Sequence, residues 1–169
     1  FLRISDYVES SNAFWNVLDE IASGEDTNSD SPSEQRGLAI AAMGSLFSRD
    51  ERTLIRIMEL IEMKSEAAQF YFDAFTGLAS LSHCNKELLW IYQQVEKLIR
   101  ERKTFGLIPL IKRFPEDGTI RDAIVSGASD YVDWPFHQQL VIKAMAENYS
   151  AYAEARHTLE ALAWRKDRC

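Results

Sequence analysis

Residues 51–81 read ERTLIRIMELIEMKSEAAQFYFDAFTGLASL, and this stretch decides the fold. In its first half, Leu54, Ile57 and Ile61 recur at spacings of three and four residues. Such spacing places them on one face of an α-helix. The second half, residues 68–81, is apolar around most of its circumference, which is typical of a helix at the centre of a fold. The stretch therefore predicts one amphipathic helix followed by one buried helix.

The same helical period continues along the chain. Alternation of apolar and polar residues never persists over the length of a strand. The connections are short, so neighbouring helices should pack antiparallel. We therefore predict an all-α fold of antiparallel helix pairs, stacked as a short α-solenoid or an irregular helical bundle of about nine helices. The further segments with this period are residues 4–22, 38–47, 88–99, 105–114, 120–125, 136–144 and 152–164.

A polar segment divides the sequence unevenly. Residues 24–31 read GEDTNSDS and carry no hydrophobic period, as in a loop or linker. Ser31 and Pro32 then fit the cap and the first position of a new helix. With 169 residues the chain suits one domain. We predict an N-terminal helix over 1–23, a polar linker over 24–31 and a single helical domain over 32–169.

The composition limits the class of protein. The formal net charge of -7 argues against bulk attraction to nucleic acid or to anionic membranes. No apolar run reaches the ~18 residues of a membrane span, and no signal-peptide pattern opens the chain. Cys84 and Cys169 are too few for a disulfide scaffold and suit free thiols in a reducing compartment, with an intermolecular bridge through Cys169 as the alternative. We expect a soluble, intracellular protein in the cytoplasm.

No motif of the sequence specifies a catalytic, metal or cofactor site. The glycines are scattered singly, so no phosphate-binding loop is present. Glu154 and His157 form a Glu-x-x-His step on one helix face, which di-iron bundles use twice with further glutamates. Here the step occurs once, and we interpret it as a pair of solvated surface groups. We therefore predict no cofactor, no metal site and no catalytic residue.

The charges of the chain are unevenly distributed. Residues 97–113 hold six bases against one acid, Glu101, and so have a net charge of +5, whereas residues 1–35 have a net charge of -7. Bases are common at helix C-termini, but a basic ridge could also bind an acidic protein, a phosphate backbone or the acidic N-terminal segment of the same chain. Trp134, beside Pro135, is either a cover over the core or an exposed anchor. The candidate partner-binding residues are Arg100, Arg102, Lys103, Lys112, Arg113 and Trp134.

Residues 107–128 read LIPLIKRFPEDGTIRDAIVSGA, and they resemble a HEAT repeat. In that family a first helix carries a proline in a leucine-rich stretch, here Pro109. A turn with an aspartate follows, here Asp117, and an aliphatic–arginine pair opens the second helix, here Ile120 and Arg121. The resemblance covers about one repeat and implies a scaffold or binding surface built from stacked helix pairs, without naming a ligand.

These observations predict a non-enzymatic protein–protein interaction or scaffold domain built from helical repeats, with another protein as its partner. A nucleic-acid-associated helical-repeat domain that uses the basic ridge at 97–113 is the first alternative. A helical enzyme with a carboxylate/His site at Glu154 and His157 is the second.

Overall fold

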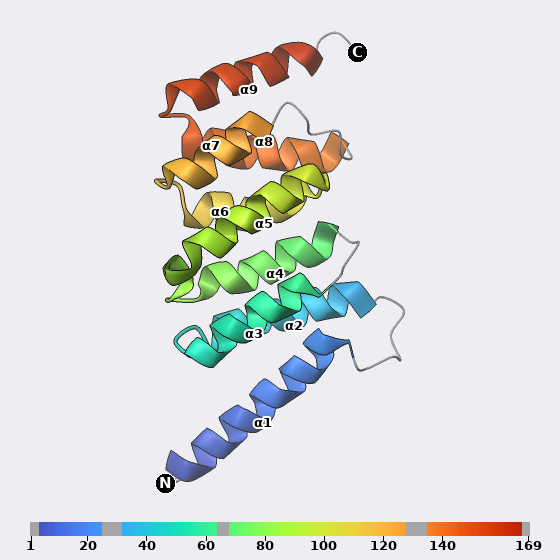
Figure 1. Cartoon of the computed structure of the whole chain (residues 1–169). Helices are drawn as coiled ribbons and strands as arrows, with labels where there is room; N and C mark the ends of the chain where they lie inside the picture. Colours follow the sequence, from blue (N-terminus) through green and yellow to red (C-terminus); the bar gives the residue numbers. More distant parts are fainter. Residues whose placement is uncertain (1–3, 25–31, 64–67, 128–134, 167–169) are drawn as a thin grey trace. The chain divides into compact units, whose positions relative to one another are not determined.

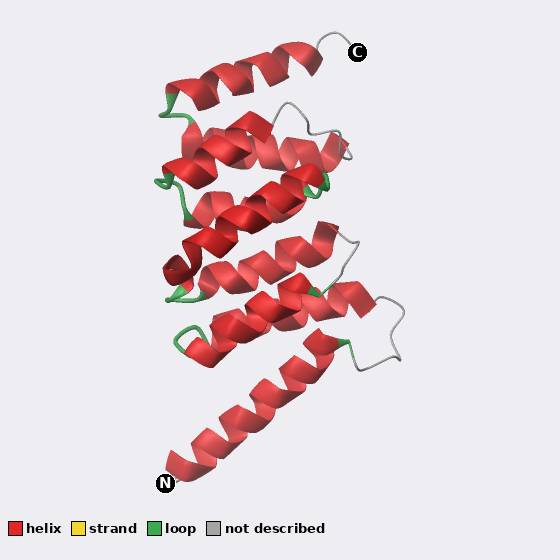
Figure 2. Cartoon of the chain, in the orientation of Figure 1, coloured by secondary structure: helices red, strands yellow, loops and turns green. Residues whose placement is uncertain are grey.

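The computed structural model describes residues 4–24, 32–63, 68–127 and 135–166. Within these ranges the chain forms nine α-helices and two short 3₁₀ helices, without a β-strand (Figure 2). The predicted all-α fold is confirmed. None of the described helices combines the length and the apolar character needed to cross a membrane.

The structure divides into two compact units, Phe1–Cys84 and Asn85–Cys169. The predicted single domain over 32–169 crosses this boundary, and it stays a prediction because compactness alone does not show which segments fold independently. Residues 25–31 of the predicted linker lie outside the described residues. The helices of unit 1 are α1 (Ile4–Ser23), α2 (Pro32–Leu46), α3 (Glu51–Glu62) and α4 (Ala68–Ser80) (Figure 1). Those of unit 2 are α5 (Leu88–Arg100), α6 (Ile108–Arg113), α7 (Gly118–Gly127), α8 (Pro135–Tyr149) and α9 (Ala153–Lys166), and the 3₁₀ helices are η1 (Cys84–Glu87) and η2 (Thr104–Leu107).

The centre of unit 1 is the crossing of α2 and α4, where two backbones touch. A Cβ atom on Gly44 would overlap the carbonyl group of Gly77, and a Cβ atom on Gly77 would overlap the carbonyl oxygen of Ile40. Glycine at both positions therefore sets the distance between the helices. α4 is buried through Phe70 and Phe75, as its apolar circumference predicts.

Polar side chains of α3 hold α1 in place through a hydrogen bond, a cation–π contact and an ion pair. The indole of Trp15 donates a hydrogen bond to the hydroxyl of Thr53 at 2.9 Å, and the guanidinium of Arg52 lies 4.0 Å from the centre of the Trp15 ring. Arg56 forms an ion pair with Asp19 at 2.6 Å. These contacts place one face of α1 on α3. They leave Phe14, which the helical period predicts to be buried, 50% exposed.

The connection between α1 and α2 begins as the sequence predicts. Gly24 has a φ of +75°, a left-handed conformation that ends α1. The guanidinium of Arg36, in α2, donates a hydrogen bond to the carbonyl of Ala22 at 2.9 Å. A cation thus provides a hydrogen-bond partner for a backbone carbonyl in the last turn of α1.

Unit 2 repeats one packing pattern, in which a helix contacts the second helix after it. α5 packs against α7, and α6 packs against α8, which also contacts α9. The segment 105–114, predicted as one helix, is divided between η2 and α6. Pro109 causes the division, because it has no N–H and fits only the first turn of an α-helix. Asp117 caps α7, where its carboxylate accepts from the backbone N–H of Ile120 at 2.9 Å and from the hydroxyl of Tyr92 at 3.0 Å.

Asp73 is a buried acid on the α2 side of α4. Its side chain accepts a hydrogen bond from the amide of Gln69 at 3.0 Å, and its Cβ atom lies close to Gly37 of α2. Burial raises the pKa of Asp73, and the charge of Glu34 contributes in the same direction. The carboxylate form is therefore disfavoured in the folded protein.

We expect Gly44→Ala to lower the free energy of unfolding by about 1–3 kcal/mol or more, because the added methyl group must separate α2 from α4. Urea denaturation measures the change. The matched control is Gly118→Ala, where the added Cβ atom would lie 3.5 Å from the guanidinium of Arg121, an ordinary contact. Equal stability of Gly44→Ala and the unchanged protein would show that the crossing is not this close.

We expect Asp73→Asn to stabilise the protein at neutral pH. A carboxyl group whose folded pKa is raised contributes stability below its unfolded pKa, of about 3.9, and that contribution is lost as the pH rises through the folded pKa. The asparagine keeps an acceptor for Gln69 without the buried charge, so its advantage should disappear near pH ~3. Urea denaturation at both pH values tests this, with the exposed Glu20→Gln as control. An advantage that persists in acid would contradict the assignment.

Candidate functional site

The predicted site residues that the structure describes all lie in unit 2, but in different places. Glu154 and His157 line a groove between α7 and α9. The basic residues of 97–113 lie at the ends of α5 and α6. Trp134 lies outside the described residues.

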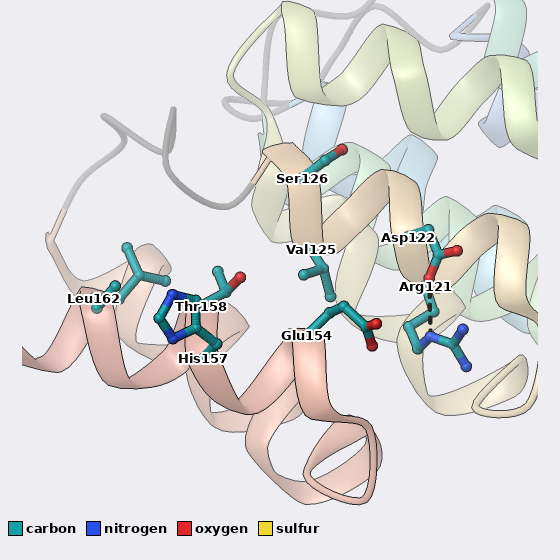
Figure 3. A pocket seen from close by; sticks show the side chains of 9 residues that line it. Arg121, Asp122, Val125, Ser126, Glu154, His157, Thr158 and Leu162 are labelled. Atoms are coloured by element: carbon teal, nitrogen blue, oxygen red, sulfur yellow. Dashed lines mark hydrogen bonds and ion pairs between the residues drawn. The ribbon is translucent and has the colours of Figure 1, made fainter.

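The groove between α7 and α9 has a volume of about 480 Å³ (Figure 3). Val125 of α7 and Leu162 of α9 give it an apolar surface, while Glu154 points toward the Arg121–Asp122 pair at one end. The groove thus combines an apolar surface with charged groups. Its lining residues are Arg121, Asp122, Val125, Ser126, Glu154, His157, Thr158, Ala161 and Leu162.

Arg121 joins the two walls of the groove at this charged end. Its guanidinium lies 3.9 Å from the centre of the Tyr152 ring and forms an ion pair with Asp122 at 3.0 Å. The hydroxyl of Tyr152 in turn donates to the carboxylate of Glu116 at 2.8 Å, next to the cap of α7. The start of α9 is therefore held against the α6–α7 turn.

The two tyrosines beside Arg121 stay neutral at physiological pH. The hydrogen bond to Glu116 raises the pKa of Tyr152, and burial raises the pKa of Tyr149. A phenol already titrates near pH ~10, so neither contributes a negative charge. Among the residues that line the groove, Arg121 carries a positive charge, and Asp122 and Glu154 carry negative charges.

The structure brings Glu154 and His157 into the groove, and both side chains are exposed. No hydrogen bond joins them to each other in the described part of the chain. The hydroxyl of Ser126 donates to the backbone carbonyl of Ala123 at 3.0 Å. Among the described residues, no group of three or more His, Cys, Asp or Glu is placed to hold a metal ion.

The predicted basic ridge is divided between two ends of α5. Arg100 is the last residue of α5, whereas Arg113 donates to the side chain of Asn85, before α5, at 3.5 Å. The 13 residues of α5 span ~20 Å at 1.5 Å per residue. Lys112 lies with Arg113 in the last turn of α6. Residues 97–113 therefore form two basic groups rather than one continuous ridge.

The group at the end of α5 is built on a helix cap. The N–H of Lys103 bonds the carbonyl of Leu98 at 2.8 Å and the N–H of Arg102 bonds that of Ile99 at 3.0 Å, the pattern of a Schellman motif. Arg102 has a φ of 59° at the position where glycine is usual. This left-handed conformation is strained for a residue with a Cβ atom. The side chain of Arg102 is exposed.

One acid partly neutralises this group. Lys103 forms an ion pair with Glu101 at 2.8 Å, and this hydrogen bond lowers the pKa of Glu101. Arg100 and Arg102 are exposed. Their guanidinium groups are accessible positive charges at this end of α5.

The sequence alone did not identify the α7 wall of the groove. A signal was present, because Arg121 and Val125 are four residues apart and share a half-buried face of α7, beside the face that carries the buried Ile120 and Ile124. The period places these two side chains on one face, but it does not show that α9 lies across from it.

Comparison with protein-family models, with curated proteins and with solved structures found no match to this chain.

We expect Arg102→Gly to raise the free energy of unfolding by about 0.5–1 kcal/mol, since it removes the left-handed strain at some cost in chain entropy. Arg100→Gly is the matched control, because it removes the same charge from the last residue of α5, which has a helical conformation, and should lower stability by up to about 1 kcal/mol. Urea denaturation distinguishes the two. A loss of stability in Arg102→Gly would show that this arginine makes a stabilising contact.

Proposed function

We propose that the chain is a non-enzymatic protein-interaction domain that binds a segment of another protein in the groove between α7 and α9. The observation that carries the proposal is the groove itself, with its apolar surface, its exposed Glu154 and a volume of about 480 Å³. Sites that bury a ligand commonly have volumes of about 300–1,000 Å³ and a few polar groups that fix orientation.

The packing of unit 2 supports this proposal. A helix that contacts the second helix after it leaves side chains of neighbouring helices in rows, and α-solenoids use such surfaces for binding. The resemblance of residues 107–128 to a HEAT repeat implies the same kind of function. Arg100 and Arg102, exposed at the end of α5, are candidates for a second contact with the partner.

We expect the Ala161→Trp variant to lose binding of the partner protein. Ala161 is exposed and lines the groove, so an indole there fills the groove without disturbing the core. The measurement is affinity capture from a lysate of the source organism, with and without nuclease. The full chain is the bait, and capture should fall at least about tenfold, a loss of ~1.4 kcal/mol.

The matched control is Glu160→Trp, one residue away on α9 and outside the groove lining. A protein retained by this variant and lost by Ala161→Trp would support the proposal. Equal capture by both variants would contradict it. A parallel bait with Arg100, Arg102 and Lys103 changed to Glu tests the second contact.

The two alternatives give different outcomes in these measurements. Capture that disappears with nuclease, together with affinity that falls steeply as salt rises, would favour the nucleic-acid function. Glu154 and His157 share the groove, which is the observation in favour of an enzyme. Fe, Mn or Zn bound to the purified protein and lost in Glu154→Gln would favour a metal-dependent enzyme.

A further inference from the structure

We propose that the partner segment is an extended peptide that carries a basic side chain and, four residues away, an aliphatic side chain. This inference rests on the proposed function and identifies the chemistry of the partner.

The charges of the groove select a cation. Arg121 already forms an ion pair with Asp122 and stacks on Tyr152, and its side chain is only 18% exposed. Glu154 is exposed and points into the same end of the groove (Figure 3). Its carboxylate is therefore available to a ligand, whereas the carboxylate of Asp122 is already paired with Arg121. A Lys or Arg side chain is the complement of Glu154.

The apolar part of the groove lies at the opposite end. Leu162 is 8% exposed and lies away from Glu154, on the far side of Val125 (Figure 3). Ala161 lines the groove beside Leu162. Ala161 is exposed, and an aliphatic side chain of the partner would cover it together with the edge of Leu162, at about 25 cal/mol for each Å² of apolar area buried.

The distance between the two ends fixes the spacing. Glu154 and Leu162 are eight residues apart on α9, which is ~12 Å along the helix axis. An extended peptide advances about 3.3 Å per residue, so four residues cover ~13 Å. Residues four apart in an extended chain also point to the same side. A basic residue at position i and an aliphatic residue at position i+4 therefore reach both ends.

The middle of the groove suits the backbone of such a peptide. An extended segment carries unpaired N–H and C=O groups, and those facing the groove need partners. His157 and Thr158 lie between Glu154 and Leu162 on α9 and line the groove. Their imidazole and hydroxyl groups both donate and accept hydrogen bonds.

The test uses three synthetic peptides titrated into the full chain and followed by NMR. They are acetyl-Lys-Ser-Gly-Ser-Leu-amide and its matched forms with Gln or Glu in place of Lys. We expect the Lys peptide to bind about two- to fivefold more tightly than the Gln peptide, the range of an exposed ion pair, and the Glu peptide to bind most weakly. In Glu154→Gln the preference for Lys over Gln should disappear, while the affinity of the Gln peptide stays unchanged.

The matched control is Glu160→Gln, a carboxylate on the same helix but outside the groove lining, which should keep the preference for Lys. A preference for Lys that survives Glu154→Gln, an order of affinity that favours Glu, or no binding of the Lys peptide would each overturn the inference. None of these results concerns the capture lost in Ala161→Trp, so the proposed function stands or fails separately.

Discussion

The contact between the backbones of α2 and α4 is the constraint on which unit 1 depends. α2 also packs against α1 and α3, so the position of each helix follows from where α2 lies. Gly44 and Gly77 allow the close approach because neither has a Cβ atom. Dispersion forces between two backbones are gained only at this separation, and they fall steeply with a gap of less than 1 Å. The aromatic side chains of α4, Phe70 and Phe75 among them, then fill the remaining interior.

Much of the fold could be predicted from local chemistry. Asp50 and Asp117 cap α3 and α7, and Gly24 ends α1, because these signals act within one turn of the chain. The apolar period of residues 88–99 likewise predicts α5, which begins at Leu88, but it does not predict the 3₁₀ helix η1 that precedes it.

The candidate site could be predicted only in part, because it depends on contacts between distant segments. The spacing of Glu154 and His157 places both on one face of α9, and the structure confirms that they share a face of the groove. The Arg121 side chain across the groove comes from a helix that the period alone does not position. The basic residues of 97–113 are adjacent in sequence, yet the turn after α5 carries Arg113 back to Asn85 and away from Arg100.

The left-handed conformation of Arg102 has a consequence at the level of the gene. Every arginine codon becomes a glycine codon by the change of a single base, so the residue that relieves the strain is always within one mutation. The number of base changes required therefore does not explain why arginine, and not glycine, occupies this position. Its side chain is exposed, as is that of Arg100, and a use for this charge on the surface would account for an arginine where the backbone favours glycine.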